Sequence, residues 1–429
     1  MARRYHTVTK QGLSSEKQLA DFLIRNGQQL LPMIELIEQS RMAVDELIDC
    51  VGRVTIQAVL MASAEQVAGP RQQGTAKDRE ILWYGKQGGS VYLREGKLAV
   101  ERPRLRRRGH GRGKEVVVPA YAAMQDRTGM QTRMLEILLN GVSTRKYQEI
   151  IPQLADRVGV AKSSVSRESI QASETALKEL LERPLGDKKI LVIYLDGIHC
   201  GERCVIGAVG VDDQGYKTVL GIQEGATENA AACKELLQNL VARGLDPERK
   251  CLFVIDGSKA LRSAINAVFG QQHPVQRCRH HKLANVIERL PKDQQDQMRS
   301  AIRAAWKMNA NEGMARLRKL AEWLQRDYPD AAASLLEGLE ECFTINRLDL
   351  PPTLHRCLAT TNVIESSQSG VRMRTRRICR WRASMPQRWV AAAFLETEKH
   401  FRRIMGYREL WALKATLQGE ATKIKEKIA

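Results

Sequence analysis

Three acidic side chains are spaced so that a fold could gather them around metal ions. Asp196 follows the apolar run ILVIYL, and Asp256 follows CLFVI. A carboxylate that ends a buried strand is costly unless it is paired or ligates a cation, and the glycine after each acid would let the chain turn there. Glu365 lies in TTNVIESS, early in an expected helix and among small polar residues. Each acid alone could cap a helix or lie at the surface, but together they predict a metal-binding triad.

Such a triad suits two-metal phosphoryl transfer. Mg²⁺ prefers oxygen ligands and keeps water and substrate phosphate oxygens in its coordination shell. Two such ions about 3.5–4 Å apart stabilise the attacking and leaving oxygens of an in-line displacement. Mg²⁺ is therefore the expected cofactor, and Mn²⁺ can substitute for it.

Zinc is not expected as the cofactor. Cys278 and His281 have a tight Cys-x-x-His spacing in QRCRHHK, but a structural zinc site takes four ligands. Cys200 and Cys204, near the first acid, are equally well explained as small apolar side chains. We therefore expect Cys278 and His281 to support the active site or to position DNA.

The elements around the acids predict a mixed sheet. Four β-rich runs are KKILVIYLDGIHC, RCVIGAVGVDD, YKTVLGIQEGA and KCLFVIDGSKA, with a helical stretch between the third and fourth. A further helix and the short run HPVQRC follow. Three consecutive strands, then helix, strand, helix and strand, is the order of the ribonuclease H-like α/β fold, with helices covering a mixed sheet. In that order the first and fourth strands are neighbours, so Asp196 and Asp256 would emerge side by side.

Helical periodicity predicts the remaining segments. Residues 15–68, 131–183 and 282–347 carry apolar side chains at three- and four-residue steps. Alternating runs between the first two segments predict a hairpin that turns at Glu95-Gly96. LDLPPTL interrupts the third segment, and a helix capped by Thr360, Thr361 or Asn362 is expected to follow.

Two segments are expected to contact DNA. RPRLRRRGHGRGK (102–114) is rich in arginine and glycine, which suits phosphate or minor-groove contact better than a solvated charged loop. A helix, a turn at Val158-Gly159-Val160 and a second helix predict a helix-turn-helix, for which an ordinary helical pair is the alternative. A third basic stretch is a helix expected to run from 372 to 382 below Glu365. The predicted DNA contacts are Arg104, Arg106, Arg107, Arg108, Arg112, Lys162, Ser163, Ser164, Arg167, Arg372, Arg374, Arg376 and Arg377.

Composition supports a globular, polyanion-binding protein. The 429 residues are 43% hydrophobic, and the formal net charge is +19. This excess favours a polyanionic partner, although charge alone does not separate DNA binders from RNA, ribosome or membrane-surface binders. The sequence predicts neither a secretory signal nor a membrane span. Nine dispersed cysteines indicate reduced, mostly buried thiols in a cytosolic protein.

Four sequence motifs resemble those of a known protein family. YLDGIHC, VIDGSKALRSAI, VQRCRHHKLANV and TTNVIES closely resemble the successive motifs of Mutator-type bacterial insertion-sequence transposases, and STRKYQEI is similar to the segment that precedes their catalytic domain. The resemblance covers about residues 120 to 400. It implies a DDE-type catalytic domain with Asp196, Asp256 and Glu365 as its acids, and it matches the family's Cys-x-x-His element with Cys278 and His281.

The long stretch between Asp256 and Glu365 matches the helical insertion domain of such transposases. Trp306 and Trp323 are expected in its core, and the resemblance adds stacking on a DNA base as the alternative for either. The expected layout is a helical N-terminal domain for DNA-end binding or dimerisation (1–75), a small basic β-rich segment (76–125), a helix-turn-helix-like domain (126–185), the catalytic domain (186–284 and 356–405), the insertion (285–355) and a tail (406–429).

These features predict a bacterial, cytoplasmic, nucleoid-associated transposase that is not membrane-bound. Its partners would be double-stranded terminal inverted repeats and target DNA, and two ends held together imply a homodimer or higher homo-oligomer. One alternative is a non-catalytic helix-turn-helix regulator, which would not need three placed acids. Another is a ribonuclease H-like nuclease without strand transfer, against which the large insertion and the basic N-terminal part argue.

Overall fold

The computed structural model describes residues 55–71, 79–93, 96–109, 115–140, 162–225, 229–378 and 380–419. The chain forms two compact units. Unit 1 comprises Met1–Met130 with Asp156–Gly159, and unit 2 comprises Gln131–Ala155 with Val160–Ala429. The turn of the predicted helix-turn-helix and most of the predicted 15–68 helices lie outside the described residues.

Unit 1 contains a long hairpin. β1 (Ile81–Leu93) pairs antiparallel with β2 (Gly96–Arg107), and β3 (Glu115–Val116) adds to β2. A helix over 55–68 and α3 (Pro119–Ala123) contribute side chains to two small apolar clusters, one with Leu60 and Val100 buried and the other with Leu105 buried. The predicted hairpin is confirmed, with Gly96 as the first residue of β2, whereas Glu95 lies outside the described part. The basic run from 102 to 107 is strand rather than loop.

Unit 2 contains the predicted mixed sheet in the order β6-β5-β4-β7-β8. β4 (Ile190–Cys200), β5 (Arg203–Asp212) and β6 (Lys217–Gly225) form an antiparallel meander. β7 (Leu252–Ile255) pairs parallel with β4, and β8 (Val275–Arg277) pairs parallel with β7. The first and fourth strands of this sheet are therefore neighbours, as predicted.

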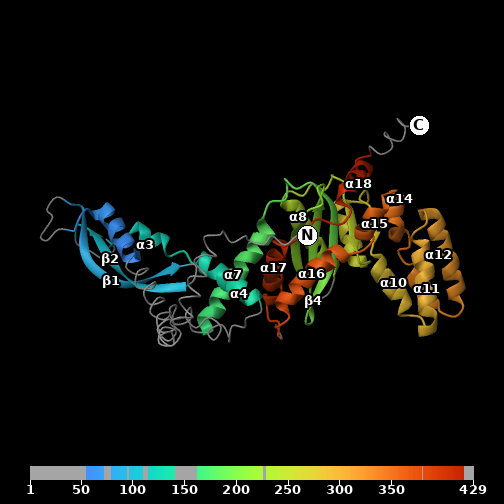
Figure 1. Ribbon diagram of the computed structural model, residues 1–429, viewed down its shortest axis with the longest axis horizontal. Helices are drawn as coiled ribbons and strands as arrows, with labels where there is room; N and C mark the ends of the chain where they lie inside the picture. The colour runs from blue at the N-terminus through green and yellow to red at the C-terminus, as the bar shows by residue number, and fades with distance from the viewer. Residues whose placement is uncertain are drawn as a thin grey trace, which may run out of the picture. The chain divides into compact units, whose positions relative to one another are not determined.

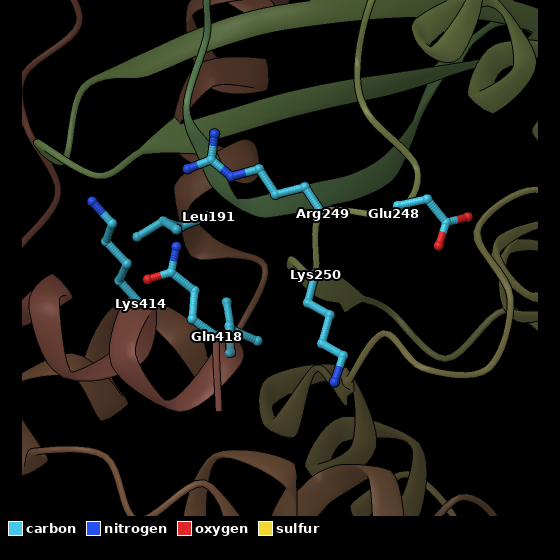
Figure 2. Close-up of a pocket in the computed structure, with 7 residues that line it drawn as sticks. Leu191, Glu248, Arg249, Lys250, Lys414 and Gln418 are labelled. Carbon is cyan, nitrogen blue, oxygen red and sulfur yellow. The ribbon is translucent and has the colours of Figure 1, made fainter. Parts of the chain in front are cut away.

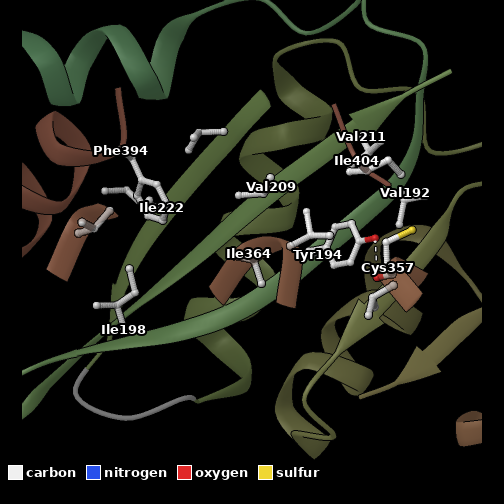
Figure 3. Packing of buried hydrophobic residues seen from close by; sticks show 14 of the residues in the cluster. Val192, Tyr194, Ile198, Val209, Val211, Ile222, Cys357, Ile364, Phe394 and Ile404 are labelled. Atoms are coloured by element: carbon white, nitrogen blue, oxygen red, sulfur yellow. Dashed lines mark hydrogen bonds between the residues drawn. The ribbon is translucent and has the colours of Figure 1, made fainter. Parts of the chain in front are cut away.

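Helices cover both faces of this sheet (Figure 1). α8 (Ala230–Ala242) and α9 (Lys259–Phe269) pack on the face that carries Ile193 and Leu195. α7 (Lys162–Glu182), α16 (Asn362–Thr375) and α17 (Met385–Glu398) pack on the opposite face, which carries Tyr194 and Ile198. Figure 3 shows this second core, in which the Tyr194 hydroxyl donates to the Cys357 carbonyl at 3.1 Å.

Helices dominate the chain between β8 and α16. They are α10 (Arg279–Ile287), α11 (Lys292–Ala305), α12 (Ala310–Gln325), α13 (Pro329–Leu336), η1 (Glu340–Phe343), α14 (Thr344–Arg347) and α15 (Pro352–Leu358). Helices α10 to α13 and η1 share a core of their own. Trp306 is buried there as predicted, but Trp323 is 53% exposed. The prediction of two core tryptophans is wrong for Trp323, because no helix in the described part of the chain covers its side of α12.

The predicted basic helix from 372 to 382 is also wrong in length. α16 ends at Thr375, and the chain turns before α17 begins at Met385 so that the two helices can pack together. The remaining elements are α4 (Thr128–Leu139), η2 (Tyr407–Glu409) and α18 (Leu410–Leu417). Within the residues that the structure describes, no helix combines the length and the apolar composition needed to cross a membrane. The seven cysteines described are all buried.

Candidate active site

Asp196 lies within β4 rather than at its end. β4 pairs with β7 only from Val192 to Leu195, but it stays paired with β5 as far as Cys200. The prediction that the strand ends at the acid and turns at Gly197 is therefore wrong. The hairpin with β5 keeps the backbone extended beyond the point at which β7 stops.

Asp256 directly follows the last residue of β7, as predicted. Leu195 and Ile255 are register partners in the parallel pair, so the two aspartates occupy the next position on neighbouring strands. Side chains alternate along a strand, which places both acids on the face that carries Tyr194. The main chain then turns at Gly257, whose φ is +111°.

Glu365 comes from the helix that covers this same face. It lies in the first turn of α16, and its neighbour Ile364 is buried in the same core as Tyr194 (Figure 3). α16 contacts both β4 and β5. The fold thus brings the three predicted acids to one face of the sheet from two strands and a helix.

Asp196 is the most buried of the three acids, with only 8% of its surface exposed. Burial, followed by the nearby charges of Asp256 and Glu365, raises the pKa of its carboxyl to about 7, against the lowering effect of His281 and of the Gly197 N–H. The other two carboxylates are therefore close enough to repel its charge. A divalent cation would relieve that repulsion, and the oxygen donors suit Mg²⁺.

Without divalent metal, the protein is expected to lose stability as the pH rises from about 4 to about 7. Asp196 titrates near pH 4 in an unfolded chain, whereas its folded pKa is about 7. Its stabilising contribution, up to about 4 kcal/mol, is full below pH 4 and is lost as the pH rises through 7. Urea denaturation in a chelator, between about pH 5 and about pH 8, measures this loss. Asp196→Asn should remove most of it, and an unchanged slope in that variant would assign the pH dependence to another group.

Cys278 and His281 lie beside Glu365. Cys278 is the N-cap of α10, where its Sγ accepts from the His281 N–H at 3.5 Å. The imidazole Nε2 of His281 is 3.9 Å from Glu365 Oε1. A hydrogen bond with Cys278, together with the charges of Cys278, Asp196 and Glu365, raises the pKa of His281 to about 9 against the effect of burial. Both residues of the Cys-x-x-His element therefore lie next to the acids.

Thr361 links these groups, a role that sequence reasoning missed. Its hydroxyl is 2.5 Å from Glu365 Oε1 and 3.3 Å from Cys278 Sγ, and its N–H is 3.4 Å from the same sulfur. Thr361 is completely buried. The sequence identified it only as a helix cap, but its spacing of four residues from Glu365 is the signal that could have indicated a contact within one helical turn.

The most compact set of metal-ligand atoms is a different one. Among the described residues, the ligand atoms of Cys278, His281 and Glu365 all lie within 4.8 Å of one another, and the three acids are not gathered as closely. Glu365 thus belongs to two sets of possible metal ligands. One is the three carboxylates, which offer only oxygen, and the other combines Glu365 with the sulfur of Cys278 and a ring nitrogen of His281.

The predicted basic residues of unit 1 lie largely on β2. Arg104 pairs with Glu115 at 2.9 Å, and the Arg106 guanidinium lies 3.8 Å from the centre of the Tyr84 ring. Arg107 and Arg108 are exposed at the end of the strand, and Arg112 lies outside the described residues. Alternation places Arg104 and Arg106 on the face opposite buried Leu105.

The predicted basic residues of unit 2 belong to α7 and α16. Lys162, Ser163 and Ser164 open α7, and their side chains lie outside the described part, whereas Arg167 is exposed. In α16, Arg372 donates to Gln368 at 3.1 Å and Arg374 donates to the Gly370 carbonyl at 3.3 Å. Arg376 and Arg377 are exposed just beyond the helix.

A separate basic pocket of about 290 Å³ lies beside Leu191, near the beginning of β4 (Figure 2). Arg249, Lys250 and Lys414 line it together with Glu248. Lys414 is paired with Asp213 at 3.0 Å. The three acids are not among its described lining residues, so this pocket is not the candidate active site.

Comparisons with known proteins agree with one another. A family model described as "Transposase, Mutator family" matches residues 27–403. The transposase for insertion sequence element ISRM5 of Rhizobium meliloti is 28% identical over 333 residues, which cover 75% of this chain and 80% of the relative. The transposase for IS256 in transposon Tn4001 of Staphylococcus aureus is 29% identical over 299 residues, 66% of this chain and 73% of the relative. The transposase for IST2 of Acidithiobacillus ferrooxidans is 34% identical over 189 residues, which cover 43% of this chain and 62% of that relative, less than two thirds of its length.

Proposed function

Because the chain belongs to the Mutator family of transposases, we propose that it binds the terminal inverted repeats of an insertion sequence and catalyses metal-dependent DNA cleavage and strand transfer. The observation that supports this chemistry best is the position of Asp196, Asp256 and Glu365 on one face of the sheet, where burial and then the charges of the other two acids raise the pKa of Asp196. Three carboxylates that repel one another have a clear use as cation ligands.

We further propose that unit 2 contains a ribonuclease H-like catalytic domain at 186–284 and 356–405. The strand order β6-β5-β4-β7-β8, with three antiparallel strands followed by two parallel ones, supports this assignment. The separate core of α10 to α13 supports an insertion domain at 285–355. The proposed N-terminal divisions, at 1–75, 76–125 and 126–185, and the tail at 406–429 follow from the sequence.

In the proposed reaction, Asp196, Asp256 and Glu365 hold Mg²⁺, for which Mn²⁺ can substitute. Bound there, two such ions supply charge stabilisation to the attacking and leaving oxygens. Thr361 orients the Glu365 carboxylate through its hydroxyl. His281, whose pKa of about 9 keeps it protonated at neutral pH, contributes positive charge beside the acids and faces the DNA phosphate.

Thr361→Val is expected to raise the Mg²⁺ concentration for half-maximal cleavage by about tenfold and to lower the free energy of unfolding by about 1 kcal/mol. Valine keeps the shape of threonine but lacks the hydroxyl that joins Glu365 to Cys278. A Mg²⁺ titration of cleavage measures the shift. Thr361→Ser keeps the hydroxyl and should behave like the wild type, and a normal Thr361→Val beside a defective Thr361→Ser would show that the methyl packing, not the hydrogen bond, matters.

The proposed partner is double-stranded DNA, both terminal repeats and target. The net charge of +19 supports it, as do the exposed Arg376 and Arg377 just beyond the helix that carries Glu365. We place the cleaved strand along this segment, and the arginines of β2 on flanking DNA. Two ends must be held at once, so the active form is a homodimer or a higher homo-oligomer, working at the nucleoid of the bacterial cytoplasm.

The test is incubation of the purified chain with labelled DNA that carries the element's ends, with Mg²⁺ or with a chelator. We expect Mg²⁺-dependent cleavage that exposes a 3′-hydroxyl, followed by joined products, including joined element ends. Cleavage without joining would favour the nuclease alternative. Specific binding without cleavage under any divalent metal would favour the helix-turn-helix regulator.

A further inference from the structure

We propose that Cys278, His281 and Glu365 form a second metal site, which takes Zn²⁺ or a similar thiophilic divalent ion and withdraws Glu365 from the acidic triad. The ion would then act as an inhibitor and not as the catalytic cofactor. The inhibition rests on the proposed function, whereas the binding itself does not.

The geometry of the three ligands supports this site. Their ligand atoms lie within 4.8 Å of one another, and His281 Nε2 is 3.9 Å from Glu365 Oε1. The ligands come from two elements, the beginning of α10 and the first turn of α16. Those two places are tied together because the Arg279 N–H donates to the Ala359 carbonyl at 2.9 Å. A small movement of side chains would therefore close the set around an ion.

The hydrogen bonds to Cys278 Sγ favour this sulfur as a metal ligand. Cys278 Sγ accepts from the His281 N–H at 3.5 Å and from the Thr361 N–H at 3.4 Å, and it lies 3.3 Å from the Thr361 hydroxyl, whose single proton is donated to Glu365 Oε1. These N–H donors stabilise the charged form of the buried sulfur. Thiolate is the form that binds metal. Hydrogen-bond donors to a ligand atom also orient it toward the ion.

The choice of ion follows from the ligand chemistry. Thiolate and neutral imidazole favour zinc and other soft or borderline ions, whereas carboxylate oxygens favour Mg²⁺. His281 would therefore release its proton when the ion binds. Three protein ligands leave one tetrahedral position for water. His281 and Glu365 have 39% and 27% of their side chains exposed, so an ion can enter from that side. Because Glu365 belongs to both sets, occupation of the soft site competes with the triad for the same carboxylate.

The chain offers a matched control in a second cysteine–histidine pair. Cys251 Sγ lies 3.5 Å from His273 Nδ1, and the other ring nitrogen of His273 lies 2.9 Å from the Pro247 carbonyl. Both side chains are buried. In the described part of the chain this pair gathers no third ligand, so it should not hold an ion.

Binding is tested on the full-length, reduced protein with Co²⁺ as a spectroscopic substitute for Zn²⁺. We expect a thiolate-to-cobalt charge-transfer absorption that saturates at one equivalent and disappears when Zn²⁺ is added. Cys278→Ser should abolish the absorption, Glu365→Gln should weaken Co²⁺ binding at least about tenfold, and Cys251→Ser should leave it intact. The absence of the band in the wild type, its persistence in Cys278→Ser or its loss in Cys251→Ser would overturn the site. If Cys278→Ser does not fold, Glu365→Gln decides, because a wild-type affinity in that folded variant excludes the proposed ligand set.

Inhibition is tested separately in the Mg²⁺-dependent cleavage assay. One equivalent of Zn²⁺ should slow cleavage by the wild type and by Cys251→Ser at least about tenfold, and a chelator selective for zinc should restore it. Undiminished cleavage at a Zn²⁺ concentration that saturates the cobalt site would overturn the competition for Glu365. An absence of cleavage with Mg²⁺ alone would instead contradict the proposed function, and the cobalt titration would still decide the site.

Discussion

Asp196→Asn is expected to reduce Mg²⁺-dependent cleavage and joining of terminal DNA by at least about 10³-fold. Metal coordination contributes several kcal/mol to the stabilisation of transition-state charge, and about 4 kcal/mol corresponds to that factor. Asn has nearly the shape of Asp but lacks the charge that a divalent cation requires. Single-turnover cleavage of labelled DNA measures the effect, and Glu365→Gln is expected to act in the same direction.

The fold should survive this substitution. Asp196 is 8% exposed and its pKa is raised to about 7 by burial and by its acidic neighbours, so Asn should leave the metal-free protein as stable at neutral pH, or more so. Asp212→Asn is the matched control. Asp212 ends β5, and its carboxylate accepts from the Gln214 and Tyr216 N–H groups at 3.0 and 2.8 Å and so holds a turn. The Asp212→Asn variant should therefore have a lower free energy of unfolding but unchanged cleavage activity. A folded, DNA-bound Asp196→Asn protein with full activity would contradict the triad.

Gly257→Ala is expected to have the second-largest effect, because this residue sets the turn directly after Asp256. Its φ of +111° strains any side chain, and an added Cβ would lie 2.2 Å from Nε and 2.6 Å from Cζ of Arg277. Arg277 cannot easily withdraw, since it is buried and donates to the Glu337 carbonyl and carboxylate at 3.2 and 3.1 Å. We expect a loss of about 3 kcal/mol in the free energy of unfolding.

Activity of folded Gly257→Ala should also fall by about 10²-fold, because a displacement of about 1 Å at a catalytic group has that effect. Gly201→Ala is the control. Gly201 also has a positive φ, +66°, but an added Cβ would meet only Trp381 at 3.4 Å in the turn after β4. It should lose about 1 kcal/mol and little activity. Denaturant unfolding and cleavage rates compare the two variants, and equal losses in both would show that positive φ alone, not the contact with Arg277, explains Gly257.

Local sequence patterns predicted the elements of the sheet because apolar alternation and its interruptions are local properties. The runs that contain β4, β5, β6 and β7 were identified, as was the neighbouring position of the first and fourth strands. What the patterns could not predict was where pairing stops. Strand β4 continues past Asp196 because it stays paired with β5. Helix α16 ends at Thr375, and the chain turns so that α17 can pack against it. Trp323 was misassigned because the period of a helix does not show which of its sides a neighbour covers.

The sequence by itself determined the identities of the acids, the order of the elements and the basic character of the chain, since these depend on residue type and short-range spacing. Only the tertiary structure decided what surrounds Glu365. Cys278 and Thr361 are far apart in the chain, yet β8 and α10 bring Cys278 to the beginning of α16, where it meets the Thr361 hydroxyl. This contact depends on how the parallel strands β7 and β8 and the helices α10 and α16 pack together. Such packing is determined by residues throughout the sheet and not by any single motif.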